Sequence, residues 1–189
     1  IGKTYKEAFQ KAIRSLETGR YGLGFAKDYN EKSKEELLRM LATPSSDRHF
    51  IMYEALRKGA TVDEIFDITK VKHYFVEQMK ELVEEEEAIA KSKGSLPSDE
   101  QLISAKKNGF SDKYLSQILA IPEDDIRNKR IELGIEEAWE GIHVSGTKDS
   151  AYYYSTYNAK DKNPVSEEKN KIMILGGGPN RIGQGIEFA

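Results

Sequence analysis

Signals for the start of a helix constrain the fold of this chain more than any other feature. In a capping box, Ser or Thr at the start of a helix and Glu or Gln three residues later bond each other's backbone N–H groups. This spacing occurs at four places: Thr4 and Glu7, Ser33 and Glu36, Thr61 and Glu64, and Ser98 and Gln101. Apolar residues at three- and four-residue spacing follow each one, as on the buried face of a helix. We therefore predict a mainly α-helical fold for residues 1–134.

Two of these helices can be delimited closely. The first is predicted over residues 4–18, with Gly19 as its C-terminal cap. The longest is predicted over residues 71–91, and its apolar stripe consists of Val71, Tyr74, Phe75, Met79, Leu82 and Val83. Glutamates 84–87 extend it, and because consecutive helical residues point in different directions, a solvated helix end is favoured over a site for a metal or a basic partner. The predicted core includes Phe50, Ile51, Ala55 and Leu56.

A weak internal repeat appears at a spacing of fifty residues, between 56–69 and 105–119. In both copies a helix is predicted to end at a glycine, Gly59 or Gly109, and a hydroxyl residue then caps a short helix. The caps are Thr61 and Ser111, and the inward positions are Ile65 and Ile68 in one copy, Leu115 and Ile118 in the other. This pattern favours two stacked helix-turn-helix-like units, although two copies are too few for a solenoid.

The helical period fades after residue 134, and the composition of the chain changes. We predict an irregular connector up to Tyr157, in which the run YYYSTY packs on the helices as an aromatic clamp. Residues 158–170 are predicted to be an exposed linker. A buried strand at 172–175, a glycine turn and a helix from Ile182 would then begin an α/β domain. The chain is thus divided into a helical domain with its connector at 1–157, a linker at 158–170 and the start of a second domain at 171–189.

The glycine-rich turn is the one candidate ligand site, because glycines between a strand and a helix let backbone N–H groups approach a phosphate. The candidates are Gly176, Gly177, Gly178, Arg181 and Gly183. A dinucleotide fingerprint would need glycine where Arg181 stands, and a Walker A loop would need Lys and Ser or Thr at 184 and 185, where the chain has Gln and Gly. A tight turn without a ligand therefore stays open as the alternative to a nucleotide-binding enzyme.

Residues 111–133 match a DNA-reading helix-turn-helix in length and pattern, which makes a nucleic-acid-binding module the alternative function. The second helix of this unit would begin with Glu123, Asp124 and Asp125, which phosphates repel. Three basic residues later in the same helix partly offset this repulsion: Arg127, Lys129 and Arg130. The net charge of −3 is also unsuited to a general binder of nucleic acid.

No catalytic residue or metal site is predicted. His49, His73 and His143 are scattered without a helical i, i+4 pair, and no nucleophile elbow surrounds Ser155 or Thr156. The chain has no cysteine, no membrane-spanning apolar run and no export signal, which predicts a cytoplasmic protein without disulfides. Because the 189 residues begin without methionine and stop within the glycine-rich motif, we expect a piece of a longer protein.

Three stretches stand out: GKTYKEAFQKAIRSLETG, AYYYSTY and KIMILGGGPNRIGQGIEF. They resemble the large subunit of carbamoyl phosphate synthetase. The first resembles the segment that closes the first synthetase half, the second the connector, and the third the opening of the second half. The helices between them correspond to the family's oligomerisation domain. The chain departs from the family pattern at 136–148, where it lacks the VDTCAAEF-like stretch that many members have before the tyrosine run, and at Ala189, where the family pattern continues with aspartate.

The resemblance implies a non-catalytic domain that fixes the two synthetase halves and associates with itself. It implies that the full-length protein makes carbamoyl phosphate from bicarbonate, ammonia and two ATP, for pyrimidine and arginine synthesis. The ammonia would come from glutamine through a glutaminase small subunit, and ATP, magnesium and potassium would bind in ATP-grasp domains outside this sequence. For these 189 residues no cofactor, nucleic-acid partner or membrane contact is expected.

Overall fold

The computed structural model describes residues 1–25, 29–142, 152–160 and 166–173. Within these residues the chain forms eight helices and a two-stranded sheet, which confirms the mainly α-helical class. The helices are α1 (Tyr5–Ser15), α2 (Lys34–Leu41), α3 (Arg48–Arg57), α4 (Val62–Thr69), α5 (His73–Ala90), α6 (Asp99–Lys107), α7 (Asp112–Leu119) and α8 (Glu123–Glu132). The strands are β1 (Ala138–Gly141) and β2 (Tyr153–Thr156).

The predicted helix starts agree closely with the structure. Complete capping boxes begin α2 at Ser33, α4 at Thr61 and α6 at Ser98. At α1, Thr4 accepts a bond from the N–H of Glu7, but the Glu7 carboxylate accepts from the N–H of Lys3 at 2.8 Å instead of returning to Thr4. The helix also ends earlier than predicted, because its last turn tightens and residue 17 already has a left-handed φ of 54°.

The internal repeat is confirmed. Gly59 and Gly109 end α3 and α6 with φ of 89° and 94°, as predicted for left-handed caps. The short helices α4 and α7 follow, and both end at a left-handed residue, Lys70 or Ala120. The next helices, α5 and α8, also begin fifty residues apart. Each copy therefore has three helices, and we call α3–α5 the first repeat and α6–α8 the second repeat.

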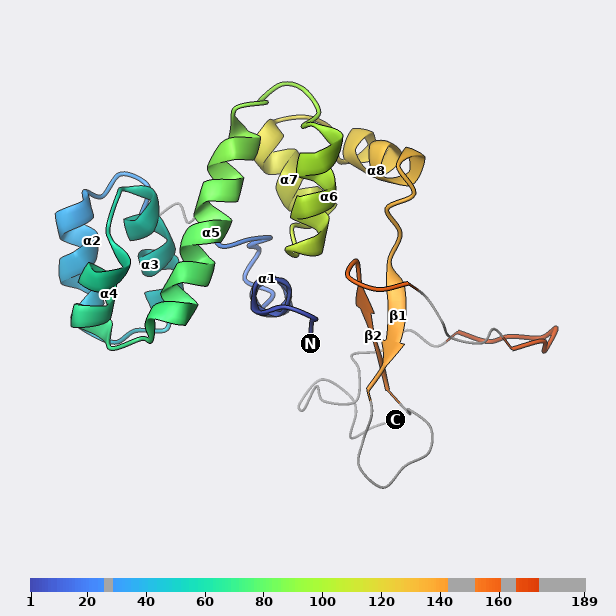
Figure 1. Cartoon of the computed structure of the whole chain (residues 1–189), viewed down its shortest axis with the longest axis horizontal. Coiled ribbons are helices and arrows are strands. Elements are labelled where there is room, and N and C mark those ends of the chain that lie inside the picture. Colours follow the sequence, from blue (N-terminus) through green and yellow to red (C-terminus); the bar gives the residue numbers. More distant parts are fainter. Residues whose placement is uncertain (26–28, 143–151, 161–165, 174–189) are drawn as a thin grey trace.

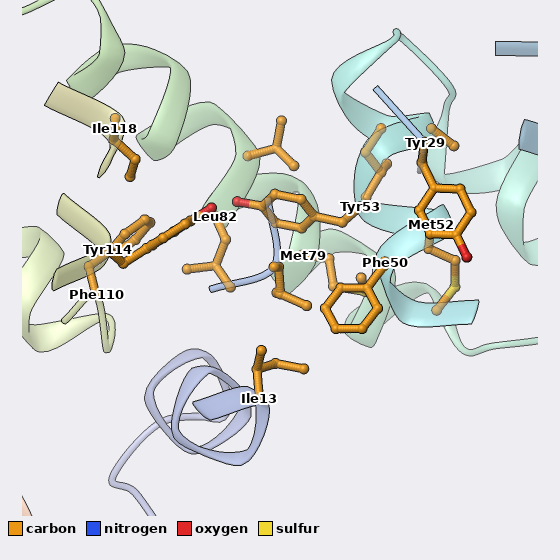
Figure 2. Close-up of a cluster of buried hydrophobic side chains, with 14 of the residues drawn as sticks. Ile13, Tyr29, Phe50, Met52, Tyr53, Met79, Leu82, Phe110, Tyr114 and Ile118 are labelled. Atoms are coloured by element: carbon orange, nitrogen blue, oxygen red, sulfur yellow. The ribbon is translucent and has the colours of Figure 1, made fainter. Parts of the chain in front are cut away.

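Helix α5 joins the two repeats. Figure 1 shows it between α2, α3 and α4 on one side and α6 and α7 on the other, with α1 seen end-on beside it. Its buried side chains include Val76, Met79, Leu82 and Val83. Side chains from α1, α3, α5 and α7 meet in one core (Figure 2). All four of the predicted core residues in α3 are buried.

Tyr74 and Phe75 do not belong to the buried stripe of α5, contrary to the prediction. They are 54% and 40% exposed, although Val76 next to them is fully buried, because successive side chains of a helix point in different directions; both rings lie against Tyr5 of α1. The prediction of a solvated glutamate run is wrong at one position: Glu84 is at the surface, but Glu86 is 2% exposed. Residue 86 follows Leu82 and Val83 by four and three positions, so it points to the same buried side of the helix.

The connector contains regular structure that the sequence did not predict. Strands β1 and β2 pair in antiparallel register, with Ala138 opposite Thr156 and Gly141 opposite Tyr153. Ala138 and Thr156 are buried on the face of this hairpin that meets the helices. Ile172 and Met173, predicted to begin a strand, lie in irregular backbone at 92% and 83% exposure, because no strand pairs with them within the described part of the chain.

Candidate functional site

Helix α1, the second repeat and the connector converge on one junction. It is made of Glu7, Lys11 and Arg14 from α1, Lys106, Gly109, Asp112 and Arg130 from the second repeat, and Ser155, Thr156, Tyr157 and Asn158 from the connector. These residues come from both ends of the described chain and from its middle. The junction therefore brings the first helix, the second repeat and the connector into contact.

Helix α1 lies directly against the turn at Gly109. A Cβ atom on Gly109 would come within 2.9 Å of the Glu7 Cα atom, so only glycine leaves room for the helix backbone. The Arg14 guanidinium donates to the Gly109 carbonyl at 2.6 Å, and the Gln10 amide donates to the Asn108 carbonyl at 3.3 Å. The C-terminal end of α6 and the turn after it thus form the surface on which α1 packs.

The Glu7 carboxylate binds the connector to α1. It accepts a hydrogen bond from the Asn158 side-chain amide at 3.1 Å and lies 3.0 Å from the Lys11 ammonium group. The Asn158 amide also donates to the Lys107 carbonyl at 2.7 Å, and Lys11 donates to the Ser155 carbonyl. Burial acts to raise the pKa of Glu7, but hydrogen bonds, first that with Thr156, outweigh it and hold the pKa below its ordinary value. Glu7 is therefore a buried anion at neutral pH.

Tyr157 is clamped by two cations of the second repeat. Its ring centroid lies 4.7 Å from Lys106 Nζ and 5.6 Å from Arg130 Cζ. Both cations are paired with Asp112, at 2.6 Å and 3.1 Å. Burial lowers the pKa of Lys106 although Asp112 opposes the shift, and burial raises the pKa of Tyr157, aided by Glu137.

The predicted aromatic clamp is confirmed for part of the tyrosine run. Besides Tyr157, the ring of Tyr154 lies 5.7 Å from Lys11 Nζ, and its hydroxyl donates to Glu140 at 2.9 Å. Tyr152 and Tyr153 are 51% and 49% exposed, so the prediction is wrong for them. Alternation along strand β2 explains the exposure of Tyr153, because neighbouring side chains of a strand point to opposite faces, and Tyr152 precedes the strand.

A cavity of about 280 Å³ lies within the junction. Its lining includes acids and bases, which is the arrangement that acid–base chemistry would need. Most of these charged side chains form ion pairs with one another: Lys106 and Arg130 pair with Asp112, and Lys11 pairs with Glu7. The arrangement is suited to holding three chain segments together.

The other sequence candidates do not come together. His49 lies in α3 with its ring 4.0 Å from that of Phe50, and burial lowers its pKa. His73 lies in α5, with Nε2 3.0 Å from Asp63 Oδ1. Among the described residues no group of three or more His, Cys, Asp or Glu could hold a metal ion. His143 and the glycine-loop residues Gly176, Gly177, Gly178, Arg181 and Gly183 lie outside the described residues.

The helix-turn-helix predicted at 111–133 forms as α7 and α8, but its surface does not favour nucleic acid. Helix α8 exposes three acidic residues in its first turn. Of the basic residues that follow, Lys129 lies 3.3 Å from Asp99, and Arg130 belongs to the junction. No observation therefore supports the nucleic-acid alternative. Across the described part of the chain, no helix has both the length and the apolar character that crossing a membrane requires.

Sequence reasoning missed the role of Glu7, which was assigned to a capping box alone. A signal was present, because Glu7 and Gln10 precede the buried Ile13 at three-residue spacing, and all three lie on the buried face of α1. Asn158 was assigned to an exposed linker, yet it is partly buried and hydrogen bonded to α1 and to the end of α6. No local pattern marks it, because its partners are distant in the sequence.

Two stacked three-helix repeats, with a first helix and a returning hairpin docked on the second of them, define a helical packing domain. Residues 1–134 match the family model described as the carbamoyl-phosphate synthetase large chain, oligomerisation domain. The chain belongs to this family, which confirms the resemblance drawn from its sequence.

The curated relatives extend the similarity over the whole chain. It is 39% identical over 191 residues to the carbamoyl phosphate synthase large chain of Nostoc sp. and 41% identical over 195 residues to that of Archaeoglobus fulgidus. It is also 39% identical over 192 residues to the arginine-specific, chloroplastic large chain of Arabidopsis thaliana. Each alignment covers 100% of this chain but only 17%, 18% and 16% of the respective relative. The chain thus spans about a sixth of the length of these relatives.

Proposed function

We propose that this region is the joint of a carbamoyl phosphate synthase large chain, which holds two synthetase halves in a fixed relation and associates with a second copy of itself. The whole protein would make carbamoyl phosphate from bicarbonate, glutamine-derived ammonia and two ATP, with a glutaminase small subunit as the source of ammonia. The product would serve arginine and pyrimidine synthesis. The name of the Arabidopsis relative supports the arginine role.

The observation that carries the role as a joint is the contact between Asn158 and Glu7. It spans 151 residues of sequence and fixes the connector against α1 at 3.1 Å. The Asn158 amide also reaches the Lys107 carbonyl at 2.7 Å, so one side chain bridges the connector to both α1 and the second repeat. Forces that act on either segment would be transmitted to the other through this contact.

The test uses the full-length large chain. Combining Glu7→Ala with Asn158→Ala removes the bridge, and small-angle X-ray scattering should then show a larger radius of gyration, because the two halves are no longer held together. Glu84→Ala is the matched control, since Glu84 is an exposed acid that pairs only weakly, at 3.7 Å, with Lys80. An unchanged radius in the double variant would contradict the role as a joint.

Self-association is supported by the family match and is tested by sedimentation of the 189-residue chain from micromolar to millimolar concentration. We expect the average mass to rise with concentration. Tyr74→Ser and Tyr152→Ser remove similarly exposed rings, at 54% and 51%, from the helical body and from the hairpin. Weaker association in the Tyr74 variant alone would place the contact on the helical body. A monomer mass throughout would contradict self-association.

ATP, magnesium and potassium are proposed to bind elsewhere in the large chain. The described residues do not fit them, because they include no acidic or histidine cluster for a metal ion, and the glycine-rich loop lies outside them. No step of the reaction is therefore assigned to this region. A ligand that binds the folded state raises the melting temperature. We expect ATP with magnesium to leave that of the 189-residue chain unchanged, and a clear rise would contradict this part of the proposal.

A further inference from the structure

A buried carboxylate lies between the two repeats. Glu86 of α5 is 2% exposed, and its Oε2 atom accepts hydrogen bonds from the hydroxyls of Tyr53 at 2.7 Å and Tyr114 at 2.6 Å. Tyr53 belongs to α3 in the first repeat and Tyr114 to α7 in the second repeat. Figure 2 shows the hydroxyl ends of the two rings pointing toward one another. One oxygen atom thus connects both repeats.

Two further hydrogen bonds stabilise the buried centre formed by Glu86, Tyr53 and Tyr114. Glu86 Oε1 accepts from the Arg57 guanidinium at 2.5 Å, which supplies a compensating positive charge. The Tyr114 hydroxyl accepts from the N–H of Gly24 at 2.8 Å. A Cβ atom on Gly24 would come within 2.5 Å of Glu86 Oε1, and one on Gly22 would overlap the Tyr114 ring. Glycine at both positions therefore lets the chain close over the centre.

The centre forms only where the two repeats meet. Fifty residues after Tyr53 stands Ile103, which is 36% exposed. Fifty residues before Tyr114 stands Glu64, which caps α4 and binds Lys34 at 2.9 Å. The equivalent positions thus have other roles, and neither repeat contains the centre by itself.

Apolar side chains would fill this space at less cost in desolvation. Replacing a buried ion pair with apolar residues of similar volume is often neutral or stabilising, so stability alone does not account for such a pair. Hydrogen bonds are directional, whereas apolar packing tolerates sliding and rotation. Two bonds to one oxygen therefore restrict how α3 and α7 are oriented around α5.

We propose that Glu86 is an orientation pin, which sets the angle between the first and second repeats through Tyr53 and Tyr114. The second repeat carries the junction, whereas α2 packs on the first repeat, so this angle fixes where the connector leaves relative to the rest of the domain. When the hydrogen bonds to Glu86 are lost, each repeat stays folded, but the angle between the two repeats is less restricted.

The first test is a double-mutant cycle in the 189-residue chain. Tyr53→Phe and Tyr114→Phe each remove one hydroxyl and keep the ring. If both hydroxyls act through one carboxylate, their effects on the unfolding equilibrium constant deviate from the product of the single effects by about threefold or more. Multiplicative effects, with no coupling, would overturn the proposal, because the two hydroxyls would then not act together through one carboxylate.

The second test measures orientation directly. Asp67 and Gln117 are exposed and occupy equivalent positions of the two repeats, and the absence of native cysteine allows Asp67→Cys and Gln117→Cys to be spin-labelled specifically. Electron–electron double resonance should give one narrow distance distribution in the otherwise unchanged chain. Glu86→Gln should broaden or shift it while circular dichroism still shows the helices.

Glu84→Gln is the matched control, because it removes an exposed charge from the same glutamate run. It should leave the distance distribution unchanged. If Glu86→Gln does not fold, the doubly substituted Tyr53→Phe and Tyr114→Phe chain takes its place in the same measurement. A distribution as narrow as the control's and centred at the same distance, in whichever of these variants folds, would overturn the proposal.

Discussion

Gly59 and Gly109 occupy equivalent turns of the two repeats, yet their surroundings differ. Both have a left-handed backbone, and the following residue donates to an equivalent carbonyl, at 2.9 Å from Ala60 to Ala55 and 3.0 Å from Phe110 to Ala105. A Cβ atom on Gly59 would meet nothing within 4 Å, whereas one on Gly109 would collide with α1. The same local signals therefore build the same turn twice, and the second turn differs in that α1 is docked on it.

The third helices of the repeats show the same divergence. Helix α5 has 18 residues and serves both repeats, whereas α8 has 10 residues and buries only Ile126, the equivalent of Val76. A polar outer helix is typical of the terminal unit of a stack. The second repeat therefore ends the stack at α8 and uses its other surfaces for α1 and the connector.

The largest expected difference between the repeats comes from alanine at the two glycines. Gly59→Ala should lower the free energy of unfolding by about 1 kcal/mol through left-handed strain alone. Gly109→Ala should lower it by about 3 kcal/mol, because overpacking against α1 adds to the strain. Urea denaturation measures both. Equal losses would show that α1 does not press on the second turn.

The next effect compares two tyrosines of the connector. Tyr157→Ala should cost about 2 kcal/mol, because it removes a ring packed against two cations. Tyr153→Ala should cost less than about 0.5 kcal/mol, because its ring is exposed. Denaturation and limited proteolysis of the connector check the difference, and a Tyr153 effect as large as that of Tyr157 would refute the clamp.

A pH-dependent effect is expected at Glu7. Glu7→Gln should cost about 1.5 kcal/mol at neutral pH, because bonds to a charged acceptor are lost. The pKa of Glu7 is lower in the folded state than its ordinary value of 4.5, so its contribution is present above pH 4.5 and is lost as the pH falls through the folded-state pKa. The difference between the two proteins should therefore shrink in acid. A difference that stays constant down to pH 2 would argue against a lowered pKa.

The smallest effect tests whether the repeats are locally alike. Thr61 and Ser111 accept from the N–H of the third helical residue at 3.1 Å in both α4 and α7. Thr61→Ala and Ser111→Ala should therefore each cost about 1 kcal/mol. Thermal denaturation compares them, and a much larger loss for Ser111 would mean that the cap also supports the junction.

The parts of the fold that depend on neighbouring residues could be predicted from the sequence. Ser33, Thr61 and Ser98 were identified as caps because each bonds a residue three positions away. The spacing of Glu86 and Glu7 to buried residues of their helices indicates burial, but their partners Tyr114 and Asn158 could not be predicted, because they lie 28 and 151 residues away. Local spacing places a glutamate on the buried face of a helix, but it does not identify the distant donor that its carboxylate meets.

The hairpin was missed for a related reason. Its first strand, AWEG, has four residues and no strong alternation, so it forms only because YYST lies beside it. The candidate site likewise depends on segments brought together by the fold. From the sequence, only the tyrosine run suggested that the connector returns to the helices.

The side-chain amide of Asn158 offers the most direct test of the claim that the helical domain holds its first helix and its connector together. In nuclear magnetic resonance spectra of the 189-residue chain, its protons should show nuclear Overhauser effects to Glu7 and Lys107 and slow exchange with water, as the contacts of 3.1 Å and 2.7 Å require. Random-coil shifts and fast exchange for this amide, with no such effects, would contradict the account.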